Sequence, residues 1–304
     1  MLLHGNNNRS GEQTGVNWNG VSSTANEQAK QFQKQRIANN VTFESFQMND
    51  ILAAFNEYFK IIHVDSPELL RDVFRLRYQV LCIEQRLPGF DVSCYPEGYE
   101  RDSYDDHSSH ILLQHRSSGD FVGTARLILP DPMNVEKPFP IEQHTQFDPA
   151  LIDVHALPRR HTAEISRLLI ERRLHRRRGD SEKKPQSELA EGSKRRFPHP
   201  LLALVVGIIQ MSAQHGITHC LSVMDPSLNR LLAPYGLQFD AIGPLIDYHG
   251  PRRPYLIDLL RMLETTYVNN SEIWELITNY GSVRLGPLKR AHQISSREML
   301  IARP

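Results

Sequence analysis

Apolar residues between positions 59 and 260 fall into short blocks, and each block has the spacing of a helix or of a strand. The first helix is predicted to begin at Ser66-Pro67, because serine is a good N-cap and proline fits the first helical position. Apolar positions that recur at intervals of three and four residues predict one buried helix face. These positions are Leu69, Val73, Leu76, Val80 and Ile83.

The other blocks predict a sheet with further helices. Strands are predicted at Phe59–Val64, Ser109–His115, Phe121–Leu129, Ala163–Ile170, Ile217–Val223, Leu237–Ile242 and Tyr255–Leu260. Two more helices are predicted, at Pro200–Gln214 and from Asp225-Pro226 to the residue before Gly236. Strand and helix do not alternate regularly, which disfavours a Rossmann-type sheet. The sequence therefore predicts an α/β (α+β) fold with a mixed, mostly antiparallel sheet flanked by helices, in which the last two strands pair antiparallel.

The two ends of the chain differ from this central region. Residues 1–42 are rich in asparagine and glutamine and poor in large apolar side chains, so we expect a disordered extension. Phe43–Lys60 has the spacing of a short amphipathic helix, which we expect to pack on the domain rather than to anchor it in a membrane. The expected domain covers residues 43–265, and a C-terminal tail, 266–304, has a candidate helix at Ile273–Thr278.

Composition and charge disfavour several classes of protein. Lys and Arg total 35, as do Asp and Glu, so the formal net charge is zero and a general binder of nucleic acid is disfavoured. No window approaches ~18 uninterrupted apolar residues and no signal peptide is evident, so we expect a cytoplasmic protein without a transmembrane segment. Peripheral contact with a membrane stays open. The three cysteines have no metal-ligand spacing, which predicts reduced thiols and no metal site.

Charged residues interrupt two of the predicted strands. Arg126 lies in an otherwise apolar strand, and a buried charge without a partner is costly, so Arg126 is expected to have one. Glu164 and Arg167 interrupt the next strand along the chain. Residues three apart point to opposite faces of a regular strand, but a β-bulge would bring both charges to one side. A structural salt bridge is the alternative to a catalytic role for this pair.

Two further polar clusters precede these strands. Arg77 lies beside the apolar stripe of the first helix, where it either reaches toward a cleft or lies along the surface. Asp102 and Asp105 belong to a run of carboxylates that repel one another unless a cation joins them. A cationic substrate or an arginine such as Arg77 can supply that cation, and a solvated turn is the simpler alternative.

In their order along the chain, these clusters resemble the motifs of the acyl-homoserine-lactone (autoinducer) synthases and of the bacterial N-acyl amino acid synthases. The similarity is strongest to the acyltransferases associated with PEP-CTERM/exosortase systems, and all three groups belong to the GNAT superfamily. It extends from about Phe59 to Leu260. The motifs are the helix Phe74–Val80, the loop Asp102-x-x-Asp105, the strand Gly123–Leu127 and the strand Glu164-x-x-Arg167.

The resemblance implies a GNAT-like sheet whose fourth and fifth strands splay apart, with the pantetheine arm of a thioester donor in the splay. It implies no bound cofactor; an acyl carrier protein or a coenzyme A thioester is the co-substrate, and a small amine is the acceptor. Glu164 and Arg167 carry over as catalytic residues, with Glu164 accepting the amine proton directly or through water. The expected substrate-binding residues are Arg77, Asp102, Asp105, Arg126 and Ser166.

A basic stretch, Glu171–Phe197, follows the fourth predicted strand and contains ten Lys and Arg against five Asp and Glu. It stands where other GNAT enzymes have a glycine-rich turn that binds pyrophosphate, which favours a carrier protein over coenzyme A as donor. Carrier proteins are acidic, so the stretch is predicted to dock one by electrostatic steering, and a solvated loop is the alternative. Nucleic acid is disfavoured because the stretch lacks interleaved aromatic residues. The predicted docking residues are Arg172, Arg173, Arg176, Arg177 and Arg178.

These observations lead to one preferred function. We expect an N-acyltransferase that moves a fatty acyl group from a thioester to the amine of an amino acid or a similar small molecule. Direct transfer is favoured because no nucleophilic Cys/His pair is evident. Autoinducer synthases have a tryptophan after the first helix, and Phe90 is the nearest aromatic residue here, which argues against S-adenosylmethionine and lactone formation. The alternatives are a short-chain acetyl-coenzyme A-dependent N-acetyltransferase and a non-catalytic acyl-carrier or ligand-binding module.

Overall fold

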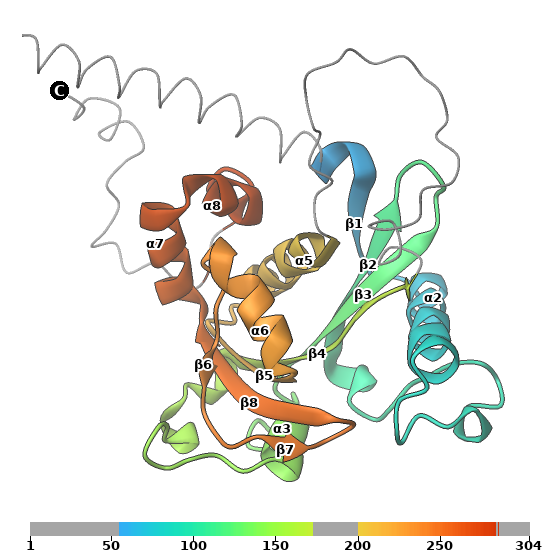
Figure 1. The fold of residues 1–304 in the computed structure, drawn as a ribbon, viewed down its shortest axis with the longest axis horizontal. Helices are drawn as coiled ribbons and strands as arrows, with labels where there is room; N and C mark the ends of the chain where they lie inside the picture. The colour runs from blue at the N-terminus through green and yellow to red at the C-terminus, as the bar shows by residue number, and fades with distance from the viewer. Residues whose placement is uncertain (1–54, 173–199, 284, 286–304) are drawn as a thin grey trace, which may run out of the picture. The chain divides into compact units, whose positions relative to one another are not determined.

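The computed structural model describes residues 55–172, 200–283 and 285, and the strands in this part of the chain join into one sheet (Figure 1). The strands are β1 (Phe59–His63), β2 (Ser108–His115), β3 (Phe121–Ile128), β4 (Thr162–Ile170), β5 (His219–Met224), β6 (Asp240–Ala241), β7 (Ile246–Asp247) and β8 (Pro251–Asp258). Their order is β1-β2-β3-β4-β5-β8-β6, and β7 pairs with β8 beside this path. All these pairs are antiparallel except β4–β5, which is parallel. The mixed, mostly antiparallel sheet predicted from the sequence is confirmed.

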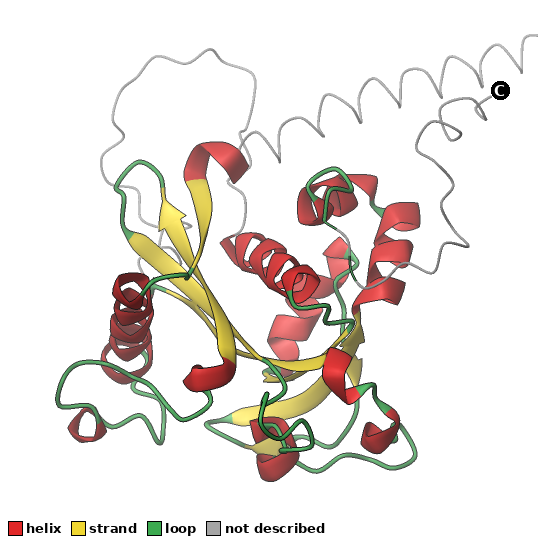
Figure 2. Cartoon of the chain, turned by 180° about the vertical axis from the view of Figure 1, so that it is seen from behind, coloured by secondary structure: helices red, strands yellow, loops and turns green. Residues whose placement is uncertain are grey.

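Helices lie on both faces of the sheet (Figures 1 and 2). They are α2 (Pro67–Tyr78), α3 (Pro140–His144), α5 (Pro200–Gln214), α6 (Pro226–Leu232), α7 (Leu259–Asn269) and α8 (Ser271–Thr278). The helices α5 to α8 share one apolar core with Ile111 and Leu127 of the sheet. On the opposite face, α2 packs against Leu112. Because strand residues alternate between faces, Ile111 and Leu112 separate these two cores.

The first helix begins where the sequence predicts. The Ser66 hydroxyl accepts a hydrogen bond from the backbone N–H of Leu69 at 3.3 Å, and Pro67 is the first helical residue. The helical path continues beyond α2 as a π-helical segment, Gln79–Glu84. Val73 and Val80 are fully buried, which confirms the predicted apolar face.

The sequence prediction is less accurate near the C-terminal edge of the sheet. The strand predicted at Tyr255–Leu260 ends at Asp258, whose carboxylate accepts hydrogen bonds from the backbone N–H groups of Leu260 and Arg261. Asp258 thereby caps α7, a helix that the sequence analysis does not predict. Of the strand predicted at Leu237–Ile242, only β6 forms, and it pairs antiparallel with β8 as expected.

Several predicted features near the ends of the chain lie outside the described residues. These include the extension 1–42 and the start of the helix predicted at Phe43–Lys60; residues 55–58 are helical, whereas Phe59 and Lys60 belong to β1. The helix predicted at Ile273–Thr278 is confirmed as α8, and Ile273 and Ile277 pack into the core around α5. Within the described residues, no helix has the length and apolar character needed to span a membrane.

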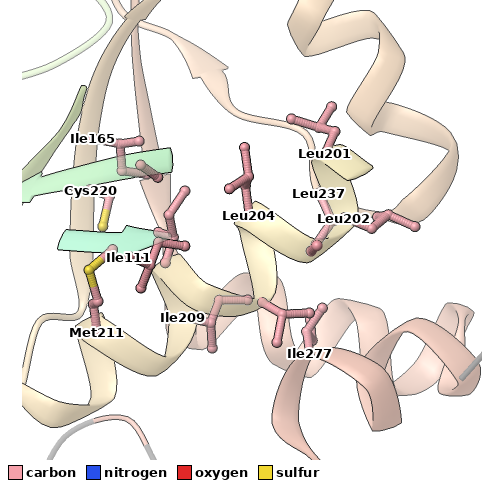
Figure 3. Packing of buried hydrophobic residues seen from close by; sticks show 14 of the residues in the cluster. Ile111, Ile165, Leu201, Leu202, Leu204, Ile209, Met211, Cys220, Leu237 and Ile277 are labelled. Atoms are coloured by element: carbon pink, nitrogen blue, oxygen red, sulfur yellow. The ribbon is translucent and has the colours of Figure 1, made fainter. Parts of the chain in front are cut away.

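The helix α5 is the centre of the larger core. Figure 3 shows Leu201, Leu204 and Ile209 of this helix packed near Ile111 and Ile165 of the sheet. At Gly207 the helix comes so close to β2 that a Cβ atom would lie 2.2 Å from Cδ1 of Ile111. Glycine at this position therefore permits the close approach of α5 to the sheet, and an alanine there would require the end of the Ile111 side chain to shift.

The strand β4 is irregular in its middle, and this irregularity prepares the candidate site. Thr124 of β3 lies opposite Leu169 and Arg126 lies opposite Ser166, so Arg167 and Leu168 together oppose one residue of β3. This is the pattern of a β-bulge, and Arg167 has a φ of 49° there. Pairing between β4 and β5 covers only Thr162–Ile165 and ends just before the bulge. The splay between the fourth and fifth strands is therefore present.

Candidate active site

A cavity of about 440 Å³ lies where β4 and β5 separate. Six consecutive residues of β4, Glu164–Leu169, line it. Because successive strand side chains point to opposite faces, a cavity lined by consecutive residues reaches both faces of the sheet. The bulge places Ile165 and Leu168 toward the core around α5, while Glu164 and Arg167 lie toward the other face with the polar lining.

The two halves of this cavity differ in chemistry. The half toward α5, α6 and α7 is apolar, with Val205, Ile208, Leu228, Leu232, Ile257 and Met262 among its lining residues. The half on the opposite face carries polar and charged groups, among them Asp102, Tyr104, Arg126, His144, Tyr248 and Arg252. One continuous space therefore offers an apolar slot on one side of the sheet and hydrogen-bonding groups on the other, and Glu164 and Ser166 belong to the polar side.

A buried ionic network forms one wall of the polar half. Its six members are Arg77, Glu100, Asp102, Asp105, Arg126 and Arg167, which we call the ionic network. Arg77 comes from α2 and is fully buried; its Nε donates to Glu100 and its Nη1 donates to Asp105 at 2.7 Å. Two positions were considered for Arg77, and its complete burial excludes the one along the surface. The other, in which it reaches toward a cleft, fits its place in the network.

The other two arginines join the Asp102–Asp105 loop to the sheet. Arg126 donates to Asp102 at 2.7 and 3.1 Å, and its Nη1 also donates to Asp105 at 2.8 Å. Its Nε donates to the Ser166 hydroxyl at 2.9 Å. Arg167 donates to Glu100 at 2.9 Å and to Asp102 at 3.1 Å. The prediction that Arg126 has a carboxylate partner is confirmed, and the carboxylates of the loop are neutralised by arginine.

Charge balances within this network. Three arginines face three carboxylates, and burial would raise the pKa of each carboxyl group if it stood alone. The charges of Arg77 and Arg167 overcome the effect of burial and hold the pKa of Glu100 below its usual value. For Asp105, Arg77 and Arg126 likewise outweigh burial and hold its pKa well below the usual range. The network is therefore fully ionised at neutral pH.

Asp102 and Asp105 differ in access. Asp105 has a side chain only 5% exposed, and its oxygens accept from Arg77, Arg126 and the backbone N–H of Asp102. The Asp102 side chain is 31% exposed and lines the cavity. Of the two roles considered for these residues, pairing with Arg77 to order the loop describes Asp105, while Asp102 is placed to contact a substrate as well.

A buried histidine lies against the network. His110 of β2 is 3.7 Å from Asp105, and neither of its ring nitrogens has a hydrogen-bond partner among the described residues. Burial lowers the pKa of His110 to about 3, against the opposing charge of Asp105. The ring is therefore neutral at physiological pH and adds no charge to the balanced network.

Glu164 lies apart from these ion pairs. Its side chain is almost completely buried, and its Oε2 accepts a hydrogen bond from the backbone N–H of Ile141 at 2.8 Å. Among the described residues, it forms no ion pair within 4.0 Å. Burial raises the pKa of Glu164 to about 7, although the Ile141 N–H and the charge of Arg126 act in the opposite direction. A carboxyl group that titrates near neutral pH is suited to accept and release a proton.

Aromatic rings complete the polar half of the cavity. Tyr248 stacks on His144 with ring centroids 5.4 Å apart, and both line the cavity. Burial raises the pKa of Tyr248, and the negative charge of Glu164 adds to the effect, so its hydroxyl stays protonated. The guanidinium of Arg167 lies 5.1 Å from the centre of the Phe90 ring, which also lines the cavity. Phe90 thus adds an aromatic contact to the carboxylate contacts of Arg167.

Most of the site residues predicted from the sequence converge in space, but important neighbours are missed. Arg77, Asp102, Asp105, Arg126, Glu164, Ser166 and Arg167 meet at this cavity or in its wall. Glu100, Tyr248 and Arg252 are not predicted. A signal for Glu100 exists, because three arginines and only two aspartates leave one positive charge to be matched. No comparable signal marks Tyr248.

The predicted docking residues are almost all outside the described part of the chain. Arg173, Arg176, Arg177 and Arg178 lie there, so the structure does not test them. Arg172 is described, and its backbone N–H donates to the carboxylate of Glu84 at 2.9 Å. The end of β4 is thereby joined to the π-helical segment that follows α2.

Comparison with known proteins gives a matching domain model for part of the chain and a shared fold. Residues 76–182 match the family model described as an acetyltransferase (GNAT) domain. No curated protein matches the sequence. The matched residues contain the whole ionic network as well as Glu164.

Solved structures with the same fold include synthases of two kinds. The CoA-dependent acyl-homoserine lactone synthase BjaI, with SAM and isopentyl-CoA, has a TM-score of 0.50 and 18% identity, over 75% of this chain and 92% of that chain. FeeM, an N-acyl amino acid synthase from uncultured soil microbes, has a TM-score of 0.41 and 12% identity, over 69% of this chain and 96% of that chain. At this level of identity, the BjaI comparison establishes the fold of the described domain, which is GNAT-like.

Proposed function

Because the chain carries a GNAT-type acyltransferase domain, we propose that it transfers a fatty acyl group from a thioester to the amine of a small molecule. The observation that carries this proposal is the position of Glu164. This carboxyl group, with its pKa near 7, lines the polar half of the cavity, which we call the polar chamber. Ile165, the next residue of β4, faces the apolar slot. A thioester carbonyl held between the two would meet an amine from the polar side.

The donor is assigned to the splay between β4 and β5. Beyond Ile165 the backbone of β4 no longer pairs with β5, so its free groups are available to an extended pantetheine arm. Backbone N–H groups of the same segment are suited to stabilise the oxyanion that forms when the amine attacks. The apolar slot beside α5 and α6 accepts the acyl chain, because its lining residues are aliphatic.

The acceptor is assigned to the polar chamber. An amine must lose its proton before or during attack, and Glu164 can take that proton directly or through one water molecule. The ionic network holds Arg126 and Ser166 rigidly beside Glu164, so the chamber is organised before a substrate enters. The proposed role of Arg167 is to fix Asp102 and the bulge of β4, since its guanidinium joins both.

The size of the apolar slot favours fatty acyl transfer over acetyl transfer. An acetyl group would leave the apolar slot unfilled, whereas a longer chain buries apolar surface there and gains about 0.8 kcal/mol for each methylene group. We therefore favour a fatty acyl donor over acetyl-coenzyme A. Whether the thioester is carried by an acyl carrier protein or by coenzyme A is left to experiment, and the resemblance to acyltransferases of PEP-CTERM systems stays a prediction from the sequence.

The test is an assay with acyl thioesters of increasing chain length and a mixture of amino acids, read by mass spectrometry. We expect N-acyl products that depend on chain length and disappear in Glu164→Gln. Glu97→Gln, which changes an exposed carboxylate away from the cavity, is the matched control and should behave as wild type. Acetylated products alone would establish the short-chain activity instead, and absence of any N-acyl product would contradict the proposal.

A further inference from the structure

The polar chamber contains a fourth arginine, Arg252, that differs from the three of the ionic network. It lies on β8 and lines the cavity. Arg77, Arg126 and Arg167 each bind a carboxylate, but the side chain of Arg252 has neither an ion pair nor a hydrogen bond to any described residue. A cation that lines a cavity without a partner is a candidate contact for an anionic group of a substrate.

The surroundings of Arg252 make the lack of a partner significant. The residue is only partly exposed, and burial lowers the pKa of its guanidinium, with Asp225 offsetting part of this effect. Asp225 forms no ion pair with Arg252, and its Oδ1 accepts a hydrogen bond from the backbone N–H of Ser227 at 2.7 Å, which caps α6. Desolvating a guanidinium without a close counter-charge is unfavourable, so an anion bound beside Arg252 would recover interaction energy that the free protein lacks.

The charge of the whole chamber supports the same conclusion. The ionic network is neutral, since three arginines balance three carboxylates. Arg252 adds one positive charge, and Glu164 adds a negative charge only when it is deprotonated. Tyr248 lies within electrostatic range of both Glu164 and Arg252, and all three side chains line the same cavity. The chamber thus presents one proton acceptor and one fixed cation.

We propose that Arg252 binds the carboxylate of the acceptor, so that the acceptor is an amino acid rather than a simple amine. The proposal rests on the function proposed above and specifies its substrate class. An amino acid is a zwitterion whose ammonium group would face Glu164 and whose carboxylate would face Arg252. Glu164 in its ionised form takes one proton from the ammonium group, and the amine nitrogen then attacks the thioester carbon. The C–S bond breaks, the thiolate takes up the proton held by Glu164, and the second proton of the attacking nitrogen is released to water, which gives an N-acyl amino acid and a free thiol.

The proposal distinguishes Arg252 from its neighbour on the same strand. Arg253 follows it directly and, because side chains alternate along a strand, belongs to the opposite face. Arg253 is absent from the lining of the cavity. Arg252→Met and Arg253→Met therefore remove the same charge from adjacent positions, and only the first changes the chamber.

The experiment compares acceptors that differ only in the carboxylate. The twenty standard amino acids are tested first with an acyl thioester, and the best acceptor is then compared with its methyl ester and with its decarboxylated amine. In the wild type, the KM of the amino acid should be lower than that of either analogue by about 10- to 100-fold, the range expected for a charge-assisted hydrogen bond. In Arg252→Met this difference should disappear, Arg252→Lys should restore part of it, and Arg253→Met should keep it. The KM of the donor should change little in all three variants.

The outcomes separate this inference from the function on which it rests. N-acylation of the decarboxylated amine as efficiently as of the amino acid by the wild type would overturn the role of Arg252 and leave the acyltransferase activity intact. If Arg252→Met instead raised only the donor KM relative to wild type, with coenzyme A thioesters but not with a phosphate-free pantetheine thioester, Arg252 would be assigned to a donor phosphate. Absence of N-acyl product from every amine would reject both proposals.

Discussion

The Oε2 atom of Glu164 lies 2.8 Å from the backbone nitrogen of Ile141, and this hydrogen bond joins the fourth strand to the short helix α3. It is the one hydrogen bond to this carboxylate within the described residues. The second oxygen, Oε1, is left for the cavity that Glu164 lines. A single N–H donor orients the group but does not offset its burial, which is why the pKa of Glu164 is raised rather than lowered.

Replacement of this carboxylate should abolish most of the catalysis. Glu164→Gln keeps the size of the side chain and its contact with Ile141 but removes the base, so turnover should fall by about 10²-fold or more. In the wild type, kcat/KM should rise as pH increases through about 7, where Glu164 becomes ionised, and the variant should lack this rise. Steady-state rates from pH 5 to 9 check the prediction, and an unchanged turnover would make Glu164 structural.

The same variant should change how stability depends on pH. The folded-state pKa of Glu164, about 7, is above the usual value of 4.5, so its contribution to stability is fully present below about pH 4.5 and is lost as pH rises through 7. Wild type should therefore lose about 3 kcal/mol relative to Glu164→Gln between pH 4 and pH 8. Urea unfolding of both proteins at the two pH values measures this. Parallel stability profiles would show that the carboxyl group is not perturbed.

Asp105 should act mainly through stability. Asp105→Asn leaves Arg77 and Arg126 with one carboxylate fewer in a buried site, which should cost about 3–5 kcal/mol of unfolding free energy. The folded-state pKa of Asp105 is lowered, so its contribution is present above about pH 4 and is lost as pH falls below that value. Asp72→Asn, at an exposed ion pair on α2, is the control and should change stability by less than about 0.5 kcal/mol. A selective rise in the acceptor KM without loss of stability would instead assign Asp105 to substrate binding.

The apolar slot should set the length of the acyl chain. Val205 of α5 is partly buried and lines the slot, so Val205→Phe should narrow it and shift the products toward shorter chains. Val205→Ala should widen it and tolerate longer chains, with each lost or gained methylene contact worth about 0.8 kcal/mol. Product lengths from a mixture of thioesters, measured by mass spectrometry, check both variants. Unchanged product profiles in both would place the acyl chain elsewhere.

Docking of an acidic carrier protein stays a prediction from the sequence. Replacing Arg176, Arg177 and Arg178 by glutamate should weaken the use of carrier-protein donors and flatten the salt dependence of the rate. A short pantetheine thioester should be used nearly as well as by wild type. The control is Arg230→Glu with Arg261→Glu, which reverses exposed charges on α6 and α7. Equal loss with both donors, or no loss with either, would contradict carrier docking.

Most of the fold could be predicted because its elements depend on neighbours in the sequence. The N-cap at Ser66 needs only the N–H of Leu69, three residues further on, and strand alternation is visible along any segment. The prediction fails where contacts that are distant in the sequence decide whether a segment forms a strand or a helix. Asp258 ends β8 and caps α7, and that helix is stabilised by packing Leu259 and Met262 into the core around α5.

The candidate site shows the same division. The residue pattern shows that Arg126, Glu164 and Arg167 are charges in apolar strands and must be paired or functional, because an isolated buried charge is too costly. Which of them are paired becomes visible in the fold. Glu100, which lies 67 residues before Arg167 in the sequence, is the carboxylate that pairs with it. Glu164 therefore forms no ion pair, and its pKa is raised. Which charges pair depends on how deeply each is buried and on the distances between segments that are far apart in the sequence. The spacing of residues along one strand determines neither.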